Sequence, residues 1–78
     1  MDIKSKIIEI VREFAENVPD ETGINLVERG IIDSMMIMNL LTSLEDEFDF
    51  ETEVKDISRT NFESIDKMAE MVNRYINK

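Results

Sequence analysis

Apolar residues recur at three- and four-residue steps in three separate segments of this 78-residue chain. This is the period of an amphipathic α-helix that buries one face. The segments run from Ile3 to about Asn17, from Ser34 to about Asp49, and from Ser64 to Ile76. A short helical turn is predicted near Glu53 to Ile57, and no segment alternates with a period of two for long enough to predict a strand. The pattern therefore predicts an all-α fold, a small four-helix bundle with three longer helices and one short helix.

The predicted loop between the first two helices, Asn17 to Ile32, is long for so small a domain. Pro19 and Gly23 interrupt any helix there. Long ordered loops in compact domains tend to carry function. Four apolar residues are expected to hold this loop against the bundle, namely Leu26, Val27, Ile31 and Ile32.

The charge balance is strongly acidic, with 18 acidic residues against nine basic ones and a net charge of −9. Such a balance argues against binding to nucleic acid or to an anionic membrane, because both require a cationic surface. No stretch approaches the ~20 apolar residues of a membrane span, and no apolar run of a secretory signal follows the N-terminus. We expect one domain over residues 1–78 that is monomeric, cytoplasmic and not inserted in a membrane.

The absence of cysteine and histidine excludes several kinds of chemistry. A Cys/His zinc site, a histidine-based triad and a thiol nucleophile all need residues that the chain lacks. A calcium loop beginning at Glu45 would need glycine where Phe50 stands. Paired carboxylates need a cleft that shifts their pKa values before they can catalyse, whereas the acids here are expected on a solvated face. An enzyme and a metal site are therefore not expected.

Ser34 is the first candidate functional residue, because it lies where the long loop becomes the second helix. A helix start exposes unpaired N–H groups and the positive end of the helix dipole, so that a phosphate placed there is favoured. Ser34 could therefore carry a phosphate-linked group. The alternative is purely structural, since serine after an aspartate such as Asp33 is common where a helix begins.

Three methionines strengthen the functional interpretation. The core face of the second helix falls in one arc, and Met35, Met36 and Met38 lie outside it. Methionine is flexible and frequent at adaptable binding surfaces. These residues are predicted to form a docking surface beside Ser34, unless the loop folds over them and makes them part of the core.

The acidic residues are also unevenly placed. The segment from Asp33 to Asp56 holds eight acidic residues and a single basic one, Lys55. A field of one sign steers partners of the opposite sign. Glu45 and Glu47 are therefore predicted to contact a basic partner, although a solvated charged face explains the same pattern.

Taken together, these residues make the chain resemble the acyl carrier protein family. The match centres on Gly30-Ile31-Ile32-Asp33-Ser34-Met35, which is similar to the family's Asp-Ser-Leu motif with Met35 in place of leucine. The resemblance implies that Ser34 carries 4′-phosphopantetheine, transferred from coenzyme A by a phosphopantetheinyl transferase, while Asp33 caps the helix and orients the site. It implies a stand-alone acyl or aminoacyl carrier that holds intermediates as thioesters. The implied partners are a loading ligase and downstream transferases or synthases.

The chain departs from fatty-acid carriers at two positions. Those carriers usually have acids two and five residues after the serine, where this chain has Met36 and Asn39. The stretch from Glu28 to Ser34 looks closer to D-alanyl carriers and to carriers of nonribosomal peptide or specialised acyl systems. The competing hypothesis is an unmodified acidic helical module that binds other proteins.

Overall fold

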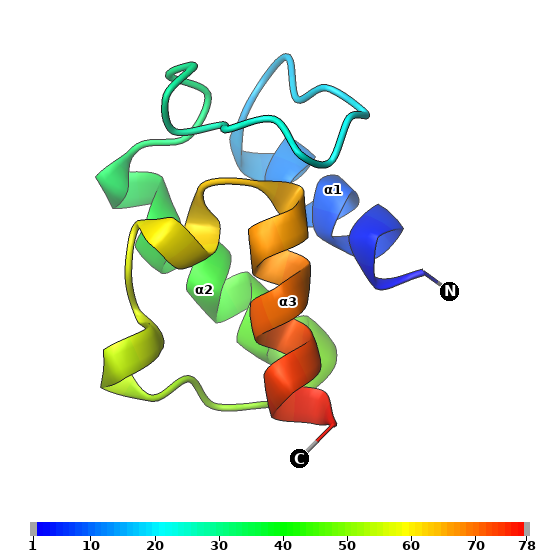
Figure 1. Ribbon diagram of the computed structural model, residues 1–78, viewed down its shortest axis with the longest axis vertical. Coiled ribbons are helices and arrows are strands. Elements are labelled where there is room, and N and C mark those ends of the chain that lie inside the picture. Colours follow the sequence, from blue (N-terminus) through cyan, green and yellow to red (C-terminus); the bar gives the residue numbers. More distant parts are fainter. Residues whose placement is uncertain (1, 78) are drawn as a thin grey trace.

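Three α-helices and two single 3₁₀ turns make up the computed structural model, which describes residues 2–77 (Figure 1). The helices are α1 (Ile3–Phe14), α2 (Ser34–Phe48) and α3 (Ile65–Ile76). The turns are η1 (Val54–Asp56) and η2 (Thr60–Phe62). No strand occurs within residues 2–77. The all-α prediction is confirmed. The predicted short fourth helix is only the single 3₁₀ turn η1, and the turn η2 was not predicted.

α1 packs against both α2 and α3, and the loop from residue 15 to residue 33 crosses one end of the bundle (Figure 1). All three helices contribute buried apolar side chains to a single core. Phe62 of η2 is completely buried in the same core. Among the four apolar loop residues expected to hold the loop, Leu26 and Ile32 are buried and Val27 and Ile31 are half-buried. Val18, earlier in the loop, is buried as well.

α1 ends at Phe14, three residues earlier than the predicted Asn17. The chain becomes extended at Ala15, and Asn17 adopts a left-handed conformation with φ of 61°. Arg12 holds the chain in this path after the end of α1. Its guanidinium donates to the Val18 carbonyl at 2.9 Å and to Asp20 at 2.7 Å. Val18 therefore reaches the core from a loop, although its spacing continues the helical stripe.

The other helix boundaries agree closely with the sequence pattern. Asp33 is the N-cap of α2, and the helix ends before Asp49, which is left-handed with φ of 55°. Ser64 is the N-cap of α3, and its buried hydroxyl accepts the Lys67 N–H at 3.1 Å. A side-chain oxygen that accepts one of the orphan N–H groups stabilises a helix start, typically by about 1 kcal/mol.

Candidate functional site at the start of α2

Ser34 is the first residue of α2 and its side chain is exposed. The capping role belongs to the preceding residue, because Asp33 Oδ1 accepts the Met36 N–H at 3.0 Å. The Asp33 carbonyl accepts the N–H groups of Met36 and Ile37 at 3.1 and 3.2 Å. Within residues 2–77 no side chain or backbone group is bonded to the Ser34 hydroxyl. The hydroxyl is thus directed by a fixed helix start and left available for chemistry.

The loop presents Ser34 through a turn that requires glycine. Gly30 has φ of +72°, a conformation that side chains disfavour, and its N–H donates to the Val27 carbonyl at 3.1 Å. Beyond it, Ile32 is buried and anchors the chain immediately before Asp33. The turn and the buried anchor together fix where α2 begins.

The predicted methionine surface is only partly present. Met35 is 83% exposed and Met38 is 53% exposed. Met36, in contrast, is half-buried and packs against the core, so its predicted exposure was wrong. The physical reason is that residues four apart share a helix face, and Met36 precedes the fully buried Leu40 by four residues.

The two glutamates predicted to contact a partner both have interactions within the chain. Glu45 is half-buried, and its Oε2 accepts the Thr52 N–H at 2.7 Å. Glu47 lies 3.7 Å from the Lys6 ammonium of α1. A contact with a partner would therefore compete with a bond that holds the segment after α2, or with an ion pair between α1 and α2.

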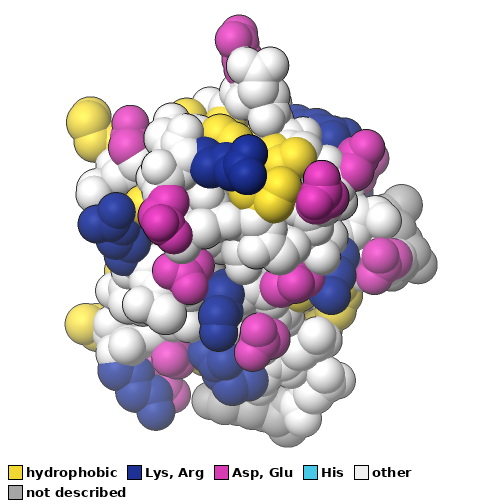
Figure 2. All heavy atoms as spheres, turned by 45° about the horizontal axis from the view of Figure 1, so that its top comes forward, with side chains coloured by type: hydrophobic (Ala, Val, Ile, Leu, Met, Phe, Trp, Pro, Cys, Tyr) yellow, Lys and Arg dark blue, Asp and Glu magenta, His cyan; other side chains and the backbone are white. Residues whose placement is uncertain are grey.

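Charged side chains of both signs cover the face seen in Figure 2, with a hydrophobic patch showing between them. No group of three metal-ligating side chains occurs in the part of the chain that the structure describes. No helix over residues 2–77 is long and apolar enough to cross a membrane. The region around Ser34 therefore offers an accessible hydroxyl and a neighbouring surface.

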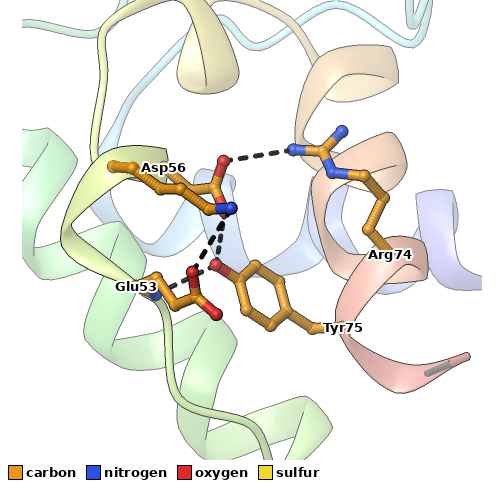
Figure 3. Close-up of a pocket in the computed structure, with 5 residues that line it drawn as sticks. Glu53, Asp56, Arg74 and Tyr75 are labelled. Carbon is orange, nitrogen blue, oxygen red and sulfur yellow. Dashed lines mark hydrogen bonds and ion pairs between the residues drawn. The ribbon is translucent and has the colours of Figure 1, made fainter.

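A separate hollow of about 170 Å³ lies where η1 meets α3 (Figure 3). The Tyr75 hydroxyl donates to Asp56 Oδ2 and accepts the Glu53 N–H at 2.9 Å. Arg74 lies 3.7 Å from the other Asp56 oxygen. Burial, and then the bond to the Asp56 carboxylate, raise the pKa of Tyr75 above its usual value of 10.0. These bonds tie the segment after α2 to α3, and none of the lining residues comes from α2.

The family described as "Phosphopantetheine attachment site" matches residues 5–72, which is most of the chain. The chain belongs to this family of carrier proteins. The D-alanyl carrier protein of Streptococcus sanguinis strain SK36 is 37% identical over 73 residues, which cover 92% of each chain. The D-alanyl carrier proteins of Streptococcus gordonii strain Challis and Streptococcus thermophilus strain LMD-9 are each 36% identical over 73 residues.

Membership of this carrier family settles which group the chain holds. The group is 4′-phosphopantetheine, attached covalently. The residues at the start of α2 fit it, because attachment through a phosphodiester needs an accessible hydroxyl, and the unbonded Ser34 side chain provides one. The predicted resemblance to carrier proteins is confirmed, and the relatives named above are D-alanyl carriers rather than fatty-acid or peptide carriers.

Proposed function

We propose that this chain is an aminoacyl carrier, that Ser34 bears the 4′-phosphopantetheine arm, and that the cargo is D-alanine. One observation supports the position of the arm above all others. Ser34 is exposed and its hydroxyl is unbonded within residues 2–77, while Asp33 supplies the helix cap. When attached, the arm supplies a terminal thiol that holds a carboxyl group as a thioester.

The residues around Ser34 suit the attachment step. The Ser34 oxygen forms a bond to the phosphorus that carries the pantetheine. The phosphoanhydride bond of coenzyme A breaks, adenosine 3′,5′-bisphosphate leaves, and the serine proton passes to a base on the transferase. The chain has no histidine to act as that base. The resulting phosphodiester lies at the N-terminus of α2, where the helix dipole and unpaired N–H groups favour a negative charge. Asp33 orients the site through its bond to the Met36 N–H.

Two features favour a small aminoacyl cargo. The relatives at 36–37% identity carry D-alanyl in their names. In addition, core side chains of α2 and α3 such as Leu40, Leu44 and Met68 are 0% exposed, so side chains already fill the space between the helices. A small polar cargo has little apolar surface to bury and gains little from entering a core. We infer that the D-alanyl group stays in solvent at the end of its arm.

The exposed methionines Met35 and Met38 form the contact with partner enzymes in this proposal. α2 has no acidic residue in its first turn, so the exposed residues that follow Ser34 along the helix begin with the uncharged Met35 and Met38. The acids near the other end of α2 steer a basic partner, with Glu47 contributing more than the half-buried Glu45. The partners are a phosphopantetheinyl transferase, a D-alanine-activating ligase and a downstream D-alanyl transferase, with loading in the cytoplasm.

The test is an intact mass measured after incubation with coenzyme A and a transferase of broad substrate range. We expect one phosphopantetheine on the wild type and on Ser43→Ala, a serine of the same helix, and none on Ser34→Ala. The modified protein is then offered D-alanine, L-alanine or a fatty acid with ATP and a matching ligase. Thioester formation with D-alanine supports the proposal. Modification of Ser34→Ala would contradict the site, and loading with the fatty acid alone would contradict the cargo.

A further inference from the structure

One carbonyl in the loop before Ser34 accepts both N–H groups that lead into the start of α2. The Leu26 carbonyl accepts two N–H groups, from Ile31 at 2.9 Å and from Ile32 at 3.2 Å. Leu26 and Ile32 are each 1% exposed, so both ends of this connection are buried. Because Asp33 and Ser34 follow directly, these two bonds connect Leu26 to the start of α2.

Leu26 is held in turn by a residue far along the chain. Its N–H donates to the Glu63 carbonyl at 2.6 Å, and Glu63 immediately precedes Ser64, the N-cap of α3. The neighbouring side chains form a second connection, because Asn25 Nδ2 donates to Glu63 Oε2 at 3.4 Å. Asn25 and Glu63 are 38 positions apart in the sequence. These bonds therefore join the loop before α2 to the segment just before α3.

Asn25 also closes the turn that leads toward Ser34. Its Oδ1 accepts the Glu28 N–H at 2.9 Å. Both Asn25 and Glu63 are half-buried. The turn itself borders an open hollow of about 410 Å³ lined by Ile24, Asn25, Glu28 and Arg29. The Asn25 side chain therefore connects this turn to the residue before α3.

We propose that Asn25 and Glu63 are positioning residues for the modification of Ser34: their bridge holds the loop so that the hydroxyl meets the transferase in a reactive orientation. This inference rests on the proposed attachment at Ser34. Neither residue takes part in the chemistry. Their effect passes through Leu26 and the two isoleucine N–H groups that precede the helix. Small displacements matter in such a step, since a misplacement of about 1 Å can cost up to about a hundredfold in rate.

A pair of substitutions tests the bond between Asn25 and Glu63 without removing the bond from the Glu28 N–H to residue 25. Asn25→Asp keeps Oδ1 as the acceptor for Glu28 but replaces the donor with a carboxylate oxygen facing Glu63. Glu63→Gln alone keeps an acceptor for Asn25. In the double variant the new amide donates to the new carboxylate, and the bridge is restored with its polarity reversed. Glu63→Ala removes the acceptor without any repulsion and serves as a second, milder variant.

The rate of phosphopantetheine transfer is measured by intact mass at a range of carrier concentrations, giving kcat and KM separately. We expect Asn25→Asp to lower kcat/KM about five- to tenfold, through misorientation of the hydroxyl. The double variant should recover to within about twofold, and Glu63→Gln should match the wild type. Glu63→Ala should be about two- to threefold slower. Amide hydrogen exchange at Ile31 and Ile32 should accelerate in Asn25→Asp and return to normal in the double variant.

Tyr75→Phe is the matched control for general destabilisation, because it weakens the separate contact between η1 and α3. It should leave the transfer rate unchanged. Equal transfer rates for Asn25→Asp and the wild type would overturn the positioning role of Asn25 and Glu63. The proposed attachment at Ser34 would stand, since the wild type would still be modified. A slow double variant would also overturn the positioning role, and it would point to direct contact between Asn25 and the transferase. A wild type that accepts no phosphopantetheine would overturn the proposed attachment site and this inference with it.

Discussion

At the scale of single residues, Gly30 is required for its backbone conformation alone. Its φ of +72° is strained for any residue with a side chain, but no atom lies within 4 Å of where a Cβ would be placed. We expect Gly30→Ala to lower the free energy of unfolding by about 1 kcal/mol through backbone strain. Gly30→Asn should cost less, because asparagine tolerates this region better. Urea denaturation measures both, and equal costs would argue that strain is not the cause.

The three methionines of α2 should separate into two classes on substitution. Met35→Glu and Met38→Glu should weaken binding to the loading ligase and leave the fold intact, because both side chains are exposed. Met36→Glu should lower the free energy of unfolding instead, since it places a charge against the core. Titration calorimetry with the ligase and thermal unfolding give the two readouts. Unchanged binding of Met35→Glu and Met38→Glu would remove this surface from the docking site.

The same residues show what the sequence could predict about the site. Asp33 as N-cap and Met35 as an exposed residue follow from local rules of helix geometry. Met36 lies one turn before the buried Leu40, at the edge of the core face, and a helical wheel does not show how far the core extends past that edge. The bond from Glu45 to the Thr52 N–H likewise depends on the path of the chain after the helix.

At the scale of elements, η1 is held by a small polar cluster, and its stability should depend on one hydroxyl. Tyr75→Phe removes the hydrogen bonds to Asp56 and to the Glu53 N–H. It keeps the ring stacked on Phe50, with the two ring centroids 5.2 Å apart. We expect a loss of about 1 kcal/mol in the free energy of unfolding, the usual net value of such hydrogen bonds. Asp56→Asn, which keeps an acceptor for the hydroxyl, should lose less. Equal losses would show that the carboxylate charge matters more than the bond.

The raised pKa of Tyr75 gives the same cluster a dependence on alkaline pH. Folding favours the protonated hydroxyl, so the folded state binds more protons than the unfolded state above pH 10.0, the unfolded value. The contribution of this group is fully present below pH 10.0 and is lost as the pH rises through the folded pKa. Urea denaturation at alkaline pH should show a steeper loss for the wild type than for Tyr75→Phe. Parallel curves would mean that the hydroxyl titrates alike in both states.

The elements differ in how well the hydrophobic pattern predicts them. α2 and α3 are predicted to within one residue at each end because caps and apolar stripes agree there. α1 was predicted too long, since Val18 continues the stripe although the chain has already left the helix. η2 has no periodic signal, because a single 3₁₀ turn is too short to show one.

At the scale of the whole molecule, the helices follow from local patterns, whereas contacts between distant segments position the loop before Ser34 and the turn η1. The three stripes are sufficient to predict an all-α bundle with Ser34 after a long loop. The contacts from Asn25 to Glu63 and from Tyr75 to Asp56 join segments 38 and 19 residues apart. Polar pairs of this kind leave no periodic pattern in one sequence. Asn25 is of a residue type that is typical of turns, so the sequence can indicate its bond to the nearby Glu28 N–H. The sequence does not indicate its bond to the distant Glu63.

Acid stability should depend on the ion pair between Lys4 and Asp66, which joins α1 to α3 at 2.9 Å. Hydrogen bonds from Lys4 and then from Thr22 lower the pKa of Asp66 below its usual 3.8. Between the folded pKa of Asp66 and pH 3.8, the unfolded state therefore binds more protons than the folded state. The contribution of Asp66 to the free energy of unfolding is present above pH 3.8 and is lost as the pH falls through the folded pKa. The pair is partly exposed, so salt screens it.

Lys4→Met should thus be less stable than the wild type at pH 7, and the difference should close as Asp66 becomes protonated. Lys67→Met is the matched control, because it makes the same change to the net charge of −9 and its ammonium has no ion pair within residues 2–77. Its difference from the wild type should reflect only the general repulsion among the acids, which weakens over the whole range where carboxylates titrate. Urea denaturation from pH 7 to about pH 2 compares the three proteins, because the folded pKa of Asp66 lies below 3.8. If Lys4→Met and Lys67→Met lose stability equally at pH 7, net charge rather than the Lys4–Asp66 pair controls how the bundle responds to acid.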